Sequence, residues 1–73
     1  MLNMSIIDNA IYAAHKPVKH VWCTGVAEVY APFERQPFVK LSGKGRTINA
    51  EFRTGASYSV TCREITNIIR EYV

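Results

Sequence analysis

The amino-acid sequence predicts an α+β domain: an antiparallel sheet of three to four strands, with an N-terminal and a C-terminal helix packed on one of its faces. Both ends of the chain carry apolar residues at helical spacing. The segment between them alternates apolar with polar residues and is rich in β-branched and aromatic side chains. Because a chain of 73 residues is long enough for one hydrophobic core, residues 1–73 are expected to form a single small domain.

The N-terminal helix is predicted by a cap, an apolar stripe and a stop signal. Ser5 can serve as the N-cap, and Asp8 lies where a negative charge interacts favourably with the helix macrodipole. Pro17 ends the helix because proline lacks the backbone N–H group and clashes with the preceding turn. The stripe is narrow and rich in alanine: Ile7, Ala10, Ile11 and Ala14.

Candidate strands fill the middle of the chain. Residues 18–30 fit one long strand with a bulge at Gly25, or two short strands that turn at Thr24 and Gly25. Residues 31–37 contain two prolines and are expected to form a loop. Three further strands, separated by turns that contain glycine, are predicted over residues 38–42, 46–54 and 57–61.

The apolar pattern also predicts how these strands pair. Facing Leu41 with Ile48 requires a turn with an even number of residues, at 44–45 or 43–46. Facing Phe52 with Tyr58 requires a three-residue loop in the next hairpin. The two helices would then cover an apolar face formed by Val39, Leu41, Ile48, Ala50, Phe52, Tyr58 and Val60.

The C-terminal helix has the clearest signature. Thr61 and Glu64 have the spacing of a capping box, in which each side chain satisfies a free backbone N–H group at the start of a helix. Val60 and Ile65 occupy the two positions of a hydrophobic staple. We therefore expect a helix from about Cys62 onward. One of its faces is apolar, at Ile65, Ile68, Ile69 and Tyr72.

The composition indicates the compartment and the charge of the partner. A net charge of +3 and a pI near 9.1 favour anionic partners. Two cysteines are too few for a disulfide framework, no apolar run approaches the roughly 18 residues of a membrane span, and the first residues lack the basic region of a signal peptide. We expect a cytoplasmic protein with reduced thiols and no membrane partner.

Metal, nucleotide and catalytic sites are not favoured. The segment Gly43-Lys44-Gly45-Arg46 has the composition of a phosphate-binding loop, but it opens a strand where such loops open a helix. His20 and Cys23 lack the paired spacing of zinc motifs. We expect no metal, no cofactor and no catalytic residue, with a small nuclease or hydrolase that uses His20 as the enzymatic alternative.

The face of the sheet opposite the helices is the candidate contact surface. Basic, hydroxyl and aromatic groups on one flat surface can contact phosphates and stack on bases. If one parity holds in residues 18–30, His20 and Trp22 join this surface; otherwise Trp22 belongs to the core. A solvated polar face, with Glu51 paired to a neighbouring cation, is the alternative. The candidate contacts are Lys40, Lys44, Arg46, Arg53, Phe38 and Asn49.

The sequence thus favours a non-catalytic binding module that contacts nucleic acid, or a machine that handles nucleic acid, through a basic sheet face and hairpin tip. The alternative is a protein-directed inhibitor or adaptor of the kind that phages and mobile elements encode. It would bind a host protein, such as a transcription or defence component, or form a homodimer through a sheet edge.

The order helix, strands, helix resembles that of the double-stranded-RNA-binding domain, and the resemblance is limited to element order. That domain carries a lysine cluster at the start of its last helix, where this sequence has TCREI, residues 61–65. An additional strand is a further departure. No site residue is assigned from this resemblance.

Overall fold

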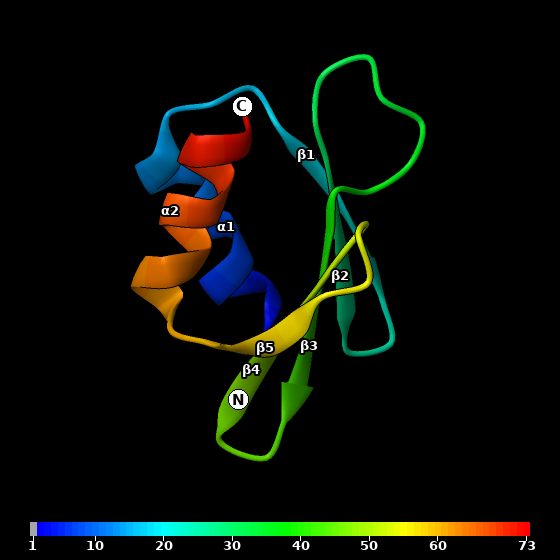
Figure 1. The fold of residues 1–73 in the computed structure, drawn as a ribbon. Coiled ribbons are helices and arrows are strands. Elements are labelled where there is room, and N and C mark those ends of the chain that lie inside the picture. Colours follow the sequence, from blue (N-terminus) through cyan, green and yellow to red (C-terminus); the bar gives the residue numbers. More distant parts are fainter. Residues whose placement is uncertain (1) are drawn as a thin grey trace.

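The computed structural model describes residues 2–73, and the backbone alone for Lys44. The elements are α1 (Met4–Ala14), β1 (Lys19–Cys23), β2 (Val26–Tyr30), β3 (Val39–Lys44), β4 (Thr47–Phe52), β5 (Ser57–Val60) and α2 (Cys62–Tyr72). The strands form one antiparallel sheet in the order β1-β2-β3-β4-β5, and both helices lie on one side of it (Figure 1). The predicted α+β arrangement is confirmed, with five strands in the sheet. Within residues 2–73 no helix is long and apolar enough to cross a membrane.

Residues 18–30 form a hairpin instead of one long strand. Cys23 pairs with Val26, and the two residues between them, Thr24 and Gly25, have φ angles of 43° and 83°. Positive φ at both positions is typical of a type I′ turn, whose twist matches the twist of paired strands. The second of the two arrangements that fit the sequence is therefore the correct one.

The turn between β3 and β4 determines the register of the middle hairpin. Gly45 and Arg46 connect the two strands, and Gly45 has a φ of 63°, a value that glycine adopts with little strain. The turn has an even number of residues, as predicted, but it lies at 45–46 instead of 44–45 or 43–46. The predicted pairing of Leu41 with Ile48 is wrong, because Leu41 lies opposite Ala50.

The loop between β4 and β5 has the predicted length and a different position. The Phe52 N–H group donates to the Ala56 carbonyl at 2.8 Å, which encloses a three-residue loop, and Gly55 at its end has a φ of 97°. Tyr58 pairs with Ala50 and not with Phe52 as predicted. In both hairpins the observed partner is two residues from the predicted one, and a shift of two keeps each side chain on its expected face.

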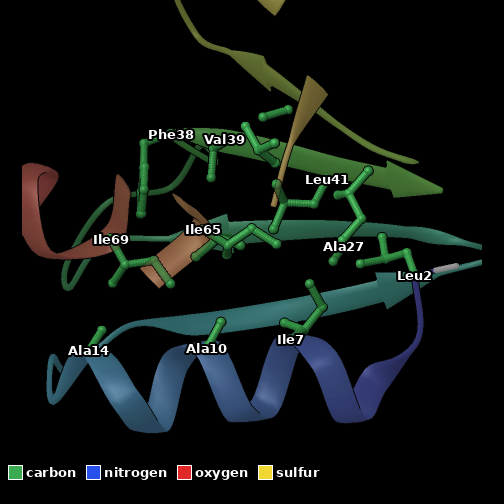
Figure 2. Packing of buried hydrophobic residues seen from close by; sticks show 14 of the residues in the cluster. Leu2, Ile7, Ala10, Ala14, Ala27, Phe38, Val39, Leu41, Ile65 and Ile69 are labelled. Carbon is green, nitrogen blue, oxygen red and sulfur yellow. The ribbon is translucent and has the colours of Figure 1, made fainter. Parts of the chain in front are cut away.

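The hydrophobic core lies between the sheet and the two helices. Figure 2 shows Ile7, Ala10 and Ala14 pointing from α1 towards the strands. Small alanine side chains let α1 lie close to its neighbours, and the Thr66 hydroxyl of α2 donates to the Ala10 carbonyl at 3.4 Å. The buried apolar residues are Leu2, Ile7, Ala10, Ala14, Ala27, Val29, Ala31, Phe38, Val39, Leu41, Ile48, Ala50, Val60, Ile65 and Ile69.

The N-terminal helix begins earlier than the sequence predicts. Asn3 and not Ser5 is its N-cap, since the Asn3 side-chain oxygen accepts a hydrogen bond from the Ile6 N–H group at 3.0 Å. Asp8 therefore lies beyond the first turn. Its carboxylate faces β1, where it contacts His20.

The start of α2 is formed as predicted. The Glu64 N–H group donates to the Thr61 hydroxyl at 3.2 Å, and the Thr61 N–H group donates to Glu64 Oε1 at 2.9 Å. Val60 and Ile65 are both buried, as a hydrophobic staple requires. The capping box therefore connects β5 directly to α2 and holds this helix over the sheet.

Replacing Thr24 by asparagine is expected to raise the free energy of unfolding by about 1 kcal/mol. Asparagine adopts left-handed φ angles at lower cost than a β-branched residue, and it is preferred at this position of a type I′ turn. Chemical denaturation measures the change. Thr54 is outside the set of residues with positive φ, so Thr54→Asn is the matched control and should change stability by less than about 0.5 kcal/mol. Equal effects of both substitutions would contradict the type I′ turn.

Candidate functional site

The sheet face opposite the helices is polar, and its charges nearly cancel. Lys40 lies in register between Glu28 and Glu51, and its Nζ atom is 3.8 Å from the Glu28 carboxylate. Lys19 lies at the β1 edge, with its Nζ atom 5.8 Å from the Tyr30 ring centroid. The outward charged side chains that the structure describes on the strands are therefore two lysines and two glutamates. The predicted contact residue Lys44 is also on this face by register, and its side chain lies outside the described part.

Glu28 also interacts with a tyrosine on this face. The Tyr30 hydroxyl donates to Glu28 Oε1 at 3.5 Å. Desolvation raises the pKa of Tyr30 above its ordinary value, and the charge and hydrogen bond of Glu28 raise it further. Like any tyrosine around neutral pH, Tyr30 is protonated and can donate this hydrogen bond.

The expected position of Phe38 on the open face is wrong. Val29 pairs with Val39, yet the Val29 carbonyl accepts a hydrogen bond from Phe38 at 3.0 Å. Two consecutive residues, Phe38 and Val39, are consequently buried, as at a β-bulge. The Phe38 ring is 2% exposed and stacks on Tyr72 of α2 with ring centroids 4.2 Å apart.

His20 and Trp22 lie on the helix-covered side of β1. Both are half-buried, and Trp22 contacts the hydrophobic core. His20 Nε2 is 3.5 Å from the Asp8 carboxylate of α1, and the His20 side chain is only 15% exposed. The outward residues of this strand include Val21, which is 48% exposed. The parity of β1 therefore places Trp22 with the core.

Arg53 holds the loop of residues 31–37 in place. One terminal nitrogen of its guanidinium lies 2.9 Å from Glu34 Oε1 and 2.7 Å from the Gln36 carbonyl, and its Nε atom donates to the Pro37 carbonyl at 3.4 Å. The Tyr72 hydroxyl is 3.1 Å from both Glu34 carboxylate oxygens. We call this set of contacts the Arg53 latch. These contacts occupy the Arg53 guanidinium, which the sequence analysis expects to contact an external partner.

The remaining predicted contacts do not converge on one site. Asn49 lies half-buried on the open face, between Ser42 and Ser59 in register. Arg46 is exposed in the turn before β4, whereas Arg53 follows the other end of that strand. Of the predicted residues with described side chains, Lys40 and Asn49 share the open face, and Arg46 stands at the hairpin tip.

A basic surface that the sequence analysis missed follows α2. Arg63 and Arg70 both line a groove of about 580 Å³ between the two helices. An adjoining groove is lined by Arg46 at the hairpin tip, and the two grooves share Ile6 and Cys62. We call Arg46, Arg63 and Arg70 the arginine surface. Arg63 and Arg70 are seven residues apart in the sequence. This spacing could have identified them as neighbours on one face of α2.

In the described part of the chain, one carboxylate lines the two grooves beside the arginine surface. Glu64 lines the groove beside Arg46, and its Oε1 atom accepts the capping hydrogen bond from Thr61. Hydroxyl and amide groups such as Thr66 and Asn67 on α2 line the grooves as well, together with apolar side chains such as Ile6 and Ala10. Such a surface can donate hydrogen bonds to an anionic group.

Metal-ligating side chains are dispersed in the part of the chain that the structure describes. Within residues 2–73 no three histidine, cysteine, aspartate or glutamate side chains are close enough to hold a metal ion. Cys23 and Cys62 are both exposed free thiols, on β1 and α2 respectively.

No protein-family model, curated protein or solved structure matches this chain. The functional argument therefore rests on the geometry of its own residues.

Replacing Arg53 by glutamine is expected to lower the free energy of unfolding by about 1 to 2 kcal/mol, because a charged donor with several acceptors is lost. Thermal or chemical denaturation measures the change, and faster amide exchange at Glu34 reports release of the loop. Arg35→Gln removes an exposed arginine from the same loop and should change stability by less than about 0.5 kcal/mol. If both substitutions have the same effect, the Arg53 latch does not stabilise the loop.

Proposed function

We propose that this protein is a non-catalytic binding module that contacts nucleic acid through the arginine surface. The observation that carries the proposal is the position of Arg46, Arg63 and Arg70 along two adjoining grooves. None of the three forms an ion pair with a carboxylate in residues 2–73. Their guanidinium groups are therefore available to phosphate oxygens, which they can bind in a bidentate manner.

The arginine surface supports this function better than the open sheet face does. On the sheet face, Lys40 lies between two glutamates, so a phosphate bound there would meet negative as well as positive charge. Among the described residues that line the two grooves, only Glu64 carries a carboxylate, and it caps α2. The nucleic-acid contact is accordingly assigned to the hairpin tip and α2.

The contact is expected to be largely independent of base sequence. Arginine, hydroxyl and amide groups along a groove bind phosphates and sugars, and these contacts set orientation without reading bases. The same surface lacks a proton-transfer pair, because arginine stays charged and Glu64 is engaged in the capping box. The proposal therefore assigns no catalytic residue. As a separate part of the proposal, the protein acts in the cytoplasm.

Salt-dependent binding tests the proposal. Fluorescence anisotropy is measured with labelled single-stranded and double-stranded DNA and RNA at about 50 mM and about 200 mM salt. If the protein contacts three phosphates, this rise in salt should weaken binding about 40-fold for duplex DNA and about 20-fold for single strands, because binding releases counterions. Arg63→Gln should weaken binding to all sequences and lower the salt slope by about 1.

Lys40→Gln is the matched control, since it removes the same charge from the open sheet face. It should leave the salt slope unchanged. The proposal fails if no probe binds at low salt, or if Lys40→Gln weakens binding as much as Arg63→Gln.

A further inference from the structure

The loop that joins β2 to β3 presents a phenylalanine to solvent. Phe33 has a relative exposure of 105%, the highest of the exposed large hydrophobic side chains in residues 2–73. The loop, green in Figure 1, projects beyond the strands. A phenylalanine that is fully exposed buries no surface on folding, so this side chain contributes no apolar burial to the stability of the domain.

The backbone at Phe33 is strained. Glu34 donates its N–H to the Ala31 carbonyl at 3.2 Å, which closes a four-residue turn with Pro32 and Phe33 in the middle. Phe33 has a φ of 68°. Proline followed by a residue with positive φ is the pattern of a type II turn, in which glycine is preferred at the position that Phe33 occupies. A bulky side chain there is a true conformational outlier.

The surrounding contacts maintain this strained conformation. In the Arg53 latch, the Arg53 side chain bonds to Glu34, Gln36 and Pro37, which follow Phe33 in the chain. On the N-terminal side, Ala31 is buried in the core. The ring is thus presented on a loop whose two ends are fixed, and pre-organisation of this kind lowers the entropic cost of binding. Strained residues held by their surroundings are concentrated at binding and catalytic sites.

Charge and position indicate the kind of partner. The Glu34 carboxylate is neutralised by Arg53, whereas Arg35 is exposed and forms no ion pair with a carboxylate in residues 2–73. One aromatic ring beside one cation fits an apolar pocket bordered by carboxylates on a protein. Arg46 of the arginine surface lies at the opposite end of β3, about 17 Å away along the strand, so it does not flank Phe33. Arg70 lines the groove between α2 and α1.

We propose that Phe33 is the anchor of a protein-docking loop, and that its partner is a protein with an apolar pocket bordered by aspartate or glutamate. Arg35 pairs with that acidic border. The docking loop and the arginine surface are separate, and this inference does not depend on nucleic-acid binding.

Site-specific photocrosslinking tests the inference. The full-length protein carries p-benzoylphenylalanine in place of Phe33, or in place of Tyr12 as the control, since Tyr12 is an aromatic residue that is 80% exposed on α1. After irradiation in extracts of the source cells, the crosslinked protein is identified, purified and used for binding measurements. The partner protein should crosslink to position 33 and not to position 12. The crosslink should lie within an apolar pocket of the partner that has carboxylates at its border.

The variants Phe33→Gly and Arg35→Gln complete the test. Phe33→Gly should weaken binding of the purified partner at least about 30-fold, as expected for a buried aromatic anchor. Its thermal midpoint should not fall, because glycine relieves the strained φ and the ring contacts nothing in the fold. Arg35→Gln should weaken binding and reduce its salt dependence.

Each contrary result overturns the inference. One such result is that position 33 crosslinks to no protein, or only to nucleic acid or lipid. Another is that the purified partner binds Phe33→Gly as tightly as the native chain. A fall in the thermal midpoint of Phe33→Gly would show that the ring serves the fold and not a partner.

Discussion

Positive backbone φ at the hairpin turns is the constraint on which the rest of the structure depends. Gly25, Gly45 and Gly55 have positive φ angles at the three tight connections of the sheet. L-amino acids with side chains rarely adopt these angles, so the position of each glycine determines where the chain turns. The turn then sets the register, and the register directs apolar residues such as Leu41 towards the helices and Lys40 towards solvent.

This register separates the functional features of the molecule. Glutamates flank Lys40 across the strands, which leaves the open face with little net charge. Arginines that form no ion pair with a carboxylate in residues 2–73 lie instead at the β3–β4 tip and along α2. At the other end of β3, the Arg53 latch and the buried Phe38 fix the loop that exposes Phe33. The two contact surfaces that we propose, one cationic and one aromatic, thus share a single small core.

The sequence predicts the faces of the elements better than their pairing. Alternation has a period of two, so it cannot distinguish Ile48 from Ala50 as the partner of Leu41, and Gly45 lies within both the expected turn at 44–45 and the observed turn at 45–46. The burial of Phe38 depends on a local bulge that alternation does not reveal. The partners of Arg53 could not be predicted because Glu34 is 19 residues away in the sequence. Capping of α2 is local, and it was predictable in full.

Cross-strand nuclear Overhauser effects in solution test the central claim most directly. If the glycine turns set the register, the backbone protons of Leu41 on β3 should show cross-strand contacts with those of Ala50 on β4. The same spectrum should place Tyr58 opposite Ala50. Backbone contacts that place Leu41 opposite Ile48 would show that apolar pairing determines the register, and they would contradict the role assigned to the glycine turns.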